Sequence, residues 1–242
     1  MTQDEPQVHR GLNGVYFDRS ATSDIDGHAV ELRYRGYSIH DLAERSTFEE
    51  VAYLLFYGDL PTRTQLEAFD AELKAARTIP REAYELIRLV KTAHPMDVLR
   101  TVVSAMATWD PDTADNSREA TLRKAIRLTA QVPTIIAAHH RIREGQPPVR
   151  DDERLGHAGN FLQMLTFEQP TRSGIELLDK DLILHAEHGT NASSFTARVV
   201  AGTEANLHAS ITAAIAALSG PSHGGAAELV MRMAQEIGDP AN

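Results

Sequence analysis

Two short stretches carry the side chains with the most evident chemistry. Residues 182–195 read LILHAEHGTNASSF, in which an apolar run ends and His188 precedes a polar, glycine-containing turn. Residues 220–225 read GPSHGG, and they place His223 between a proline-containing turn and two glycines. Each histidine follows an apolar run, so each should lie where a buried segment ends. We expect His188 and His223 to meet across one cleft.

Paired histidines beside glycine indicate a particular kind of chemistry. Glycine lets backbone and ligand approach closely, and a neutral imidazole can donate a hydrogen bond to a carbonyl oxygen that gains negative charge. Two such donors suit a carbon–carbon condensation between two carbonyl compounds. A single histidine near a helix end is more often a structural residue. The pair His188 and His223 therefore favours the catalytic interpretation, and the structural alternative stays open.

Metal chemistry fits the sequence poorly. His185 and His188 are three residues apart and lack the H-E-x-x-H order of a zinc protease. His185 and Glu187 match the H-x-E of nucleobase deaminases, but the chain has no cysteine to complete that site. We expect no metal. An unusual site would have to use His139, His140 or His208.

Serine nucleophiles are also poorly supported. Ser193 and Ser194 lie in no G-x-S-x-G turn, and Ser222 lacks the strand-to-helix context of such a nucleophile. We interpret Ser193 and Ser194 as residues at the start of a helix.

Composition narrows the class of protein. The 242 residues are 42% hydrophobic and 24% charged, as in an ordinary globular protein. A net charge of -10 argues against a nucleic-acid partner held by general electrostatics, and the absence of cysteine excludes disulfides and thiol nucleophiles. No secretory leader and no apolar run of about 18 residues is present, which predicts a cytoplasmic protein without a membrane partner.

The elements that must position the two histidines are mostly helical. Short strands are expected at 15–17 and 32–34, around a turn at Asp26 and Gly27. Capping boxes are expected at Ser46 with Glu49 and at Thr62 with Gln65. Longer helices are expected at 122–140, with a kink or break at Pro133, and at 157–167, 174–186, 192–200, 207–218 and 226–237. The alanine-rich helix at 207–218 should be buried. The fold class is therefore all-α, with a small β element near the N-terminus.

Several motifs occur in an order that identifies a family. They are GLNGV, YRGY, FEEVAYLLFYGDLP, HPM, PTIIAAHHR, HAGNFLQML, LILHAEHGTNASSF and GPSHGG. Together they cover nearly the whole chain, and the chain resembles citrate synthase. The resemblance implies an all-α homodimer with a large and a small domain and an active site between them. Residues 1–242 would be an incomplete large domain, without the small domain and the C-terminal helices that return from it.

The resemblance also implies roles for individual residues. His188 would hydrogen-bond the acetyl-CoA thioester oxygen and stabilise its enol, with Glu187 orienting it. His223 would donate to the oxaloacetate ketone. His157 would bind oxaloacetate, assisted by Asn160. Acetyl-CoA would be a co-substrate, and no bound cofactor is implied.

The implied activity is the condensation of oxaloacetate with acetyl-CoA to citrate, through an enol and hydrolysis of citryl-CoA. The family's general-base aspartate and carboxylate-binding arginines would follow residue 242, so we expect the chain as given to be inactive alone. Two alternatives remain open. One is a 2-methylcitrate synthase that uses propionyl-CoA, and the other is a non-catalytic helical module that dimerises or binds anions.

Overall fold

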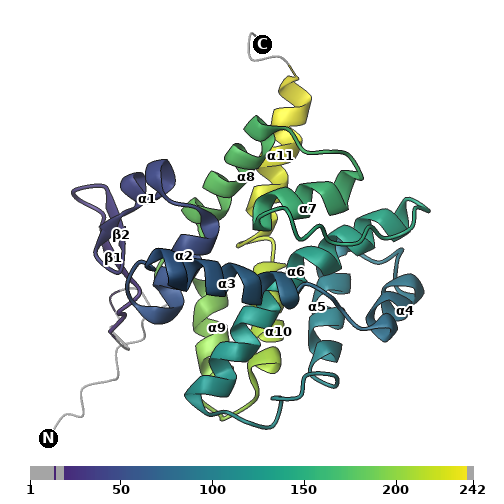
Figure 1. The fold of residues 1–242 in the computed structure, drawn as a ribbon, viewed down its shortest axis with the longest axis horizontal. Helices are drawn as coiled ribbons and strands as arrows, with labels where there is room; N and C mark the ends of the chain where they lie inside the picture. Colours follow the sequence, from purple (N-terminus) through teal and green to yellow (C-terminus); the bar gives the residue numbers. More distant parts are fainter. Residues whose placement is uncertain (1–13, 15–18, 239–242) are drawn as a thin grey trace, which may run out of the picture.

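The computed structural model describes residues 14 and 19–238, and within them it is mostly helical (Figure 1). In this part of the chain a small sheet comes first and eleven helices follow. The elements are β1 Ser23–Asp26, β2 Glu31–Tyr34, β3 Tyr37–Ser38, α1 Ile39–Arg45, α2 Phe48–Tyr57, α3 Arg63–Ala75, α4 Arg81–Leu89, α5 Pro95–Met106, α6 Arg118–Arg143, α7 His157–Thr166, α8 Arg172–His185, α9 Ala192–Ala201, α10 Leu207–Leu218 and α11 Gly225–Ile237. The all-α class with a small β element is confirmed.

The sheet is antiparallel in the order β1-β2-β3. Asp26 begins the turn between β1 and β2, where its Oδ1 accepts hydrogen bonds from the amides of His28 and Ala29, both at 2.9 Å. The predicted turn is thus confirmed, and the strand predicted at 32–34 lies within β2. The strand predicted at 15–17 falls outside the described residues.

One predicted capping box is wrong by a single residue. Thr47, not Ser46, caps α2, and Glu50 completes the box by accepting from the Thr47 amide at 2.7 Å. Ser46 instead ends α1, where its amide donates to Leu42 O at 3.0 Å. Glu49 is thereby turned inward and is buried. The local sequence therefore predicted the position of the helix boundary, but not which glutamate completes the capping box.

Other helix signals are confirmed. The capping box of Thr62 and Gln65 opens α3. The later predicted helices agree with α7, α8, α9, α10 and α11 to within two residues at each end.

Of the kink or break predicted at Pro133, the break does not occur, and the kink stays a prediction. α6 runs without interruption through Pro133, although this residue has no amide to donate to the preceding turn. α6 packs against α3, α4, α5, α7 and α10, and Figure 1 shows it crossing the middle of the molecule. Packing on all these sides holds the helix together where local sequence predicted an interruption.

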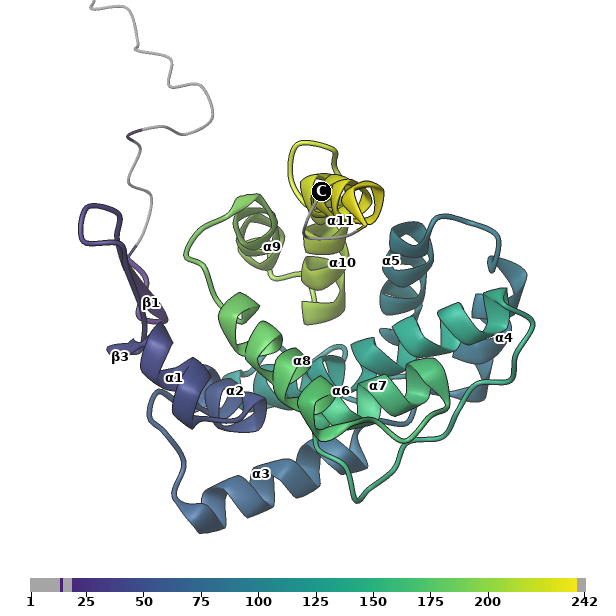
Figure 2. The same cartoon turned by 90° about the horizontal axis from the view of Figure 1, so that it is seen from above.

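Two main clusters of buried residues connect these helices. The larger joins α4, α5, α6 and α10, and a second joins the sheet, α1, α2 and α8. In Figure 2, α10 lies between α9 and α5, and it contacts both closely. The burial predicted for α10 is confirmed in part, because His208, Ser210 and Ile215 are buried whereas Ala216 is exposed.

Among the described helices, none has the length and apolar character needed to cross a bilayer.

Candidate active site

The loop that carries His188 joins α8 to α9 and has a fixed shape. Glu187 accepts hydrogen bonds from the Gly189 amide at 2.7 Å and from Thr22 Oγ1 at 3.2 Å. Gly189 has φ +62°, and a β-carbon there would lie 3.0 Å from Ile25 Cδ1, so glycine is favoured at this position. His188 is exposed and makes no hydrogen bond within the described residues. Glu187 thus shapes the loop that presents His188.

Tyr34 fastens this loop to the sheet. Its side chain is fully buried, and its hydroxyl lies 3.1 Å from Ile183 O and 3.2 Å from Leu184 O, to which it can donate. The same oxygen accepts from the Glu187 amide at 3.3 Å. Burial raises the pKa of Tyr34, so its hydroxyl keeps the proton that it donates. The small β element therefore fixes the position at which α8 ends and the loop that carries His188 begins.

The loop that carries His223 joins α10 to α11. The His223 amide donates to Gly220 O at 3.0 Å, and the Gly224 amide donates to Leu218 O at 2.9 Å. A β-carbon at position 224 would collide with the Leu218 carbonyl oxygen. This close approach explains why glycine follows His223 in the GPSHGG motif.

Ser193 connects the His223 loop to the start of α9, and no described contact or cavity joins His223 to His188, so the predicted meeting of the two histidines across one cleft stays a prediction. It lies in the first turn of α9, five residues after His188, and its Oγ is 2.8 Å from His223 Nε2. If the hydroxyl donates to Nε2, the single proton of the neutral ring lies on Nδ1, which can then donate to a ligand. Ser193 and Ser194 were predicted as helix-start residues, and this is confirmed. The contact with His223 was missed, because nothing in the local sequence pairs the two.

His157 lies at the start of α7 in a different environment. Its imidazole is 5% exposed and stacks at a tilt on Phe48, with ring centroids 4.6 Å apart. Its backbone amide donates to Glu49 Oε1 at 2.7 Å. The side chain lines an apolar cavity of about 450 Å³ between α2, α6, α7, α8 and α10. Burial, with a smaller contribution from Arg77, lowers the pKa of His157 to about 4, so the ring is neutral at physiological pH.

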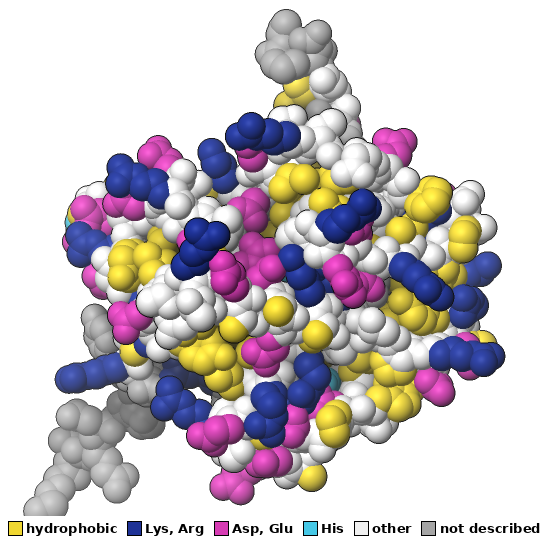
Figure 3. Space-filling view, viewed as in Figure 1, with side chains coloured by type: hydrophobic (Ala, Val, Ile, Leu, Met, Phe, Trp, Pro, Cys, Tyr) yellow, Lys and Arg dark blue, Asp and Glu magenta, His cyan; other side chains and the backbone are white. Residues whose placement is uncertain are grey.

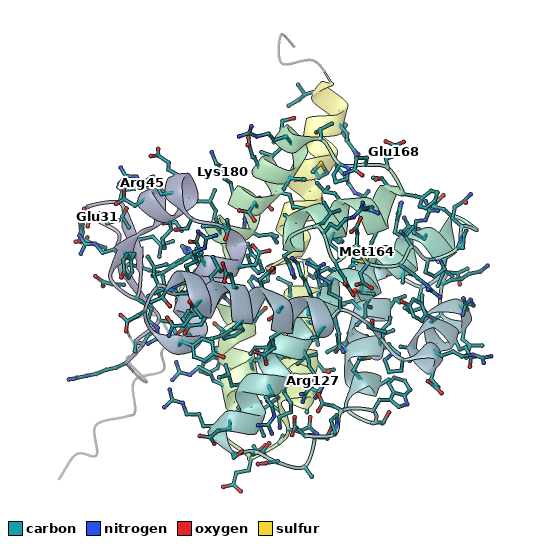
Figure 4. All side chains as sticks on the ribbon, viewed as in Figure 1. Glu31, Arg45, Arg127, Met164, Glu168 and Lys180 are labelled. Carbon is teal, nitrogen blue, oxygen red and sulfur yellow. The ribbon has the colours of Figure 1, made fainter. Side chains whose placement is uncertain are left out.

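Asn160, one turn further along α7, is also engaged within the protein. Its Oδ1 accepts from the Asp152 amide at 2.8 Å, and its Nδ2 lies 3.7 Å from Sδ of Met164, which Figure 4 labels near the centre of the molecule. The described contacts of His157 and Asn160 are with α2, the preceding loop and α7, and not with His188 or His223. A substrate role for these two residues stays a prediction.

The histidines of the unusual metal alternative have other neighbours. His139 Nε2 lies 3.1 Å from Lys91 O, and buried His208 Nε2 lies 3.5 Å from Asp110 Oδ2. Asp110 is held by Arg127, labelled in Figure 4. Across the described residues, no three histidine, aspartate or glutamate side chains gather as a metal site would require.

Comparison with known proteins shows the family of the chain. Residues 11–242 match the family model described as citrate synthase, C-terminal domain. The 2-methylcitrate synthase of Mycobacterium tuberculosis is 44% identical over 100% of this chain and 61% of its own length. The citrate synthase of Haloferax volcanii is 45% identical over 96% of this chain and 63% of its own length. The chain thus spans less than two thirds of these relatives.

Solved structures give the same result. Citrate synthase from Pyrobaculum aerophilum superposes with a TM-score of 0.92 at 42% identity, over 97% of this chain and 60% of that one. Citrate synthase from Thermoplasma acidophilum, in a ternary complex with carboxymethyl coenzyme A and oxaloacetate, has a TM-score of 0.89 at 30% identity, over 97% and 62% of the two chains. With a family model matched over residues 11–242, the chain belongs to the citrate synthase family.

Proposed function

We propose that the protein to which this chain belongs condenses oxaloacetate with acetyl-CoA, and that His188 and His223 act in that reaction. The observation that supports the proposal is the 2.8 Å contact between Ser193 Oγ and His223 Nε2, which brings the His223 loop to the start of α9, five residues after His188. Oxaloacetate is proposed because the Thermoplasma acidophilum relative binds it in its ternary complex.

The reaction needs hydrogen-bond donors at two oxygens. Removing an α-proton from the thioester places negative charge on the thioester oxygen, and attack on the ketone places it on the ketone oxygen. Two neutral imidazoles can donate one hydrogen bond to each oxygen. Hydrolysis of the resulting citryl thioester releases citrate and coenzyme A. No described residue is assigned as the base that removes the α-proton.

The choice of acyl-CoA and the assembly belong to the same proposal. A 2-methylcitrate synthase and a citrate synthase are 44% and 45% identical to this chain, so propionyl-CoA is the alternative acyl donor. A homodimer and a cytoplasmic location are retained as predictions. Several apolar side chains are exposed on α8, α9 and α11, which supports association of these helices with further polypeptide. Among them are Leu177, Leu184, Val199, Leu229, Met231 and Met233.

Steady-state kinetics with the full natural protein test this proposal. We expect oxaloacetate-dependent release of coenzyme A, with a higher kcat/KM for acetyl-CoA than for propionyl-CoA. A large preference for propionyl-CoA would make the protein a 2-methylcitrate synthase. No turnover with either thioester would favour the non-catalytic helical module.

A further inference from the structure

Asp179 joins the middle of α8 to the start of α2. Thr47 and Glu50 form the local capping box of α2, and this box gives no acceptor to the amide of Phe48, the first residue of the helix. Both carboxylate oxygens of Asp179 lie 3.2 Å from the Phe48 nitrogen and accept from it. An amide that local sequence leaves free is therefore bound by a residue more than a hundred positions away.

Asp179 belongs to the face of α8 that packs into the protein. Ile183 is four residues further on and shares this face, and its side chain is fully buried in the cluster that joins the sheet, α1, α2 and α8. The carbonyl of Ile183 accepts from the Tyr34 hydroxyl at 3.1 Å. α8 is thus held at successive points along its last two turns, and the loop that carries His188 begins directly beyond them.

The surroundings of Asp179 are unfavourable for a carboxylate. Asp179 is half-buried, and Figure 3 shows Asp and Glu side chains gathered on the face where α2 and α8 lie. Burial, and then the charges of Glu49 and Glu50, raise the pKa of Asp179 to about 6, although the Phe48 amide opposes this rise. The positive end of the α2 dipole offsets part of the cost. What the carboxylate provides in this place is a hydrogen-bond acceptor in a fixed position.

We propose that Asp179 is a positioning residue for His188. By accepting from the Phe48 amide, Asp179 fixes the rotation of α8 and its place along its own axis, and the end of α8 determines where the His188 loop begins. A shift of α8 would displace the His188 ring, and a displacement of about 1 Å can lower a rate about a hundredfold. This inference rests on the proposed role of His188 in the condensation.

Steady-state turnover by the full natural protein, with the acyl-CoA that it prefers, tests the inference. Asp179→Ala removes the acceptor, so kcat should fall about tenfold or more. Asp179→Asn keeps one acceptor oxygen for the Phe48 amide and should keep most of kcat. Its melting temperature should not fall, because the variant removes a charge from beside Glu49 and Glu50. Asp181→Asn is the matched control, since exposed Asp181 lies in the same helix, and it should keep the wild-type kcat.

A double variant separates positioning from a general loss of structure. If Asp179 acts through His188, Asp179→Ala should lower kcat in the wild type but not in a protein that already carries His188→Ala. The same fold loss in both backgrounds would overturn the inference. Equal losses in Asp179→Ala and Asp179→Asn, or a wild-type kcat in Asp179→Ala, would also overturn it.

Failure of the proposed function gives a different result. The wild type would then release no coenzyme A with either thioester, or His188→Ala would keep the wild-type kcat. In either case Asp179 would have no catalytic group to position, and the inference would be overturned together with the proposed function. Turnover that depends on His188 but shows independent losses in the double variant would overturn the role of Asp179 alone.

Discussion

The four predicted site residues lie in two contrasting regions. His188 and His223 lie in glycine-containing loops beside the start of α9, and His188 is exposed there. His157 and Asn160 lie on α7 and are 5% and 2% exposed. Three of the four are histidines, of which His188 and His223 were predicted from their local sequence and His157 only from the family resemblance, and their surroundings differ.

The difference lies in burial and in what surrounds each side chain. Asn160 uses its carbonyl oxygen on the Asp152 amide, and His157 stacks on Phe48 beside an apolar cavity. His223 uses one ring nitrogen on Ser193 and keeps the other. His157 and His223 both keep ring nitrogens for a ligand, so burial beside an apolar cavity, rather than hydrogen-bonding capacity, separates the two histidines.

The largest effect that tests this contrast is expected at His223. His223→Ala in the full natural protein should lower kcat by about 10²–10³, the usual cost of one donor to a developing oxyanion. The melting temperature should barely change, because the ring is only half-buried. His185→Ala is the control, since exposed His185 belongs to the same HAEH motif and its ring faces Asp181. Equal activities of the two variants would contradict the role of His223.

His157 should instead determine stability in acid. Its pKa falls from 6.5 in the unfolded chain to about 4 in the fold, because burial disfavours the charged ring. The unfolded state therefore binds the proton first, and stability is lost as pH falls from 6.5 towards 4, by about 3 kcal/mol. Urea unfolding at pH 7 and pH 4.5 should show a smaller acid loss for His157→Gln than for wild type. The control His40→Gln, at an exposed site on α1, should keep the wild-type loss. If both variants lost the same stability between pH 7 and pH 4.5, the proposal that His157 is buried as a neutral ring would be contradicted.

Much of the fold was predictable because its signals are local. The Thr62 box and the turn at Asp26 depend on neighbours within a few residues, and both are confirmed. The errors arise where the local structure depends on a residue that is distant in the sequence. Glu49 leaves the predicted box because it serves the start of α7, and Pro133 remains helical because α6 is packed on several sides.

The site was predictable to a smaller extent. The sequence indicated which loops carry His188 and His223, since glycine beside histidine is visible locally. It could not reveal that Ser193 contacts His223, thirty residues away, or that Tyr34 holds the end of α8 from the sheet. These contacts depend on how α8, α9 and α10 fold back on one another, which no spacing along the chain encodes.

Asn160 should behave as a structural residue. Asn160→Ala would leave the Asp152 amide without its acceptor and open a small cavity, which we expect to cost about 1–3 kcal/mol in the free energy of unfolding. Denaturant titration measures this cost, and the KM for oxaloacetate should stay unchanged. A raised KM with unchanged stability would instead support the predicted substrate contact. Asn116→Ala is the comparison for loss of another side-chain amide, because it removes a bond to Glu204 O and a longer one, at 3.4 Å, from buried Lys124 Nζ.

The smallest effect is expected at Ser193, and it is the most informative about the pair. Ser193→Ala removes one neutral hydrogen bond to His223, so kcat should fall by about two- to tenfold. In Ser193→Ala no hydroxyl favours the Nδ1–H tautomer of His223, so part of the fall in kcat should come from rings that carry the proton on Nε2 instead. Ser193→Thr keeps a hydroxyl at this position and should therefore keep most of the activity. Ser194→Ala, which removes a neighbouring hydroxyl bonded to Gly189 O at 3.1 Å, controls for loss of the α9 start. If Ser193→Ala changed stability but not kcat, His223 would not depend on Ser193 for its orientation, and the contrast with α7 would rest on exposure alone.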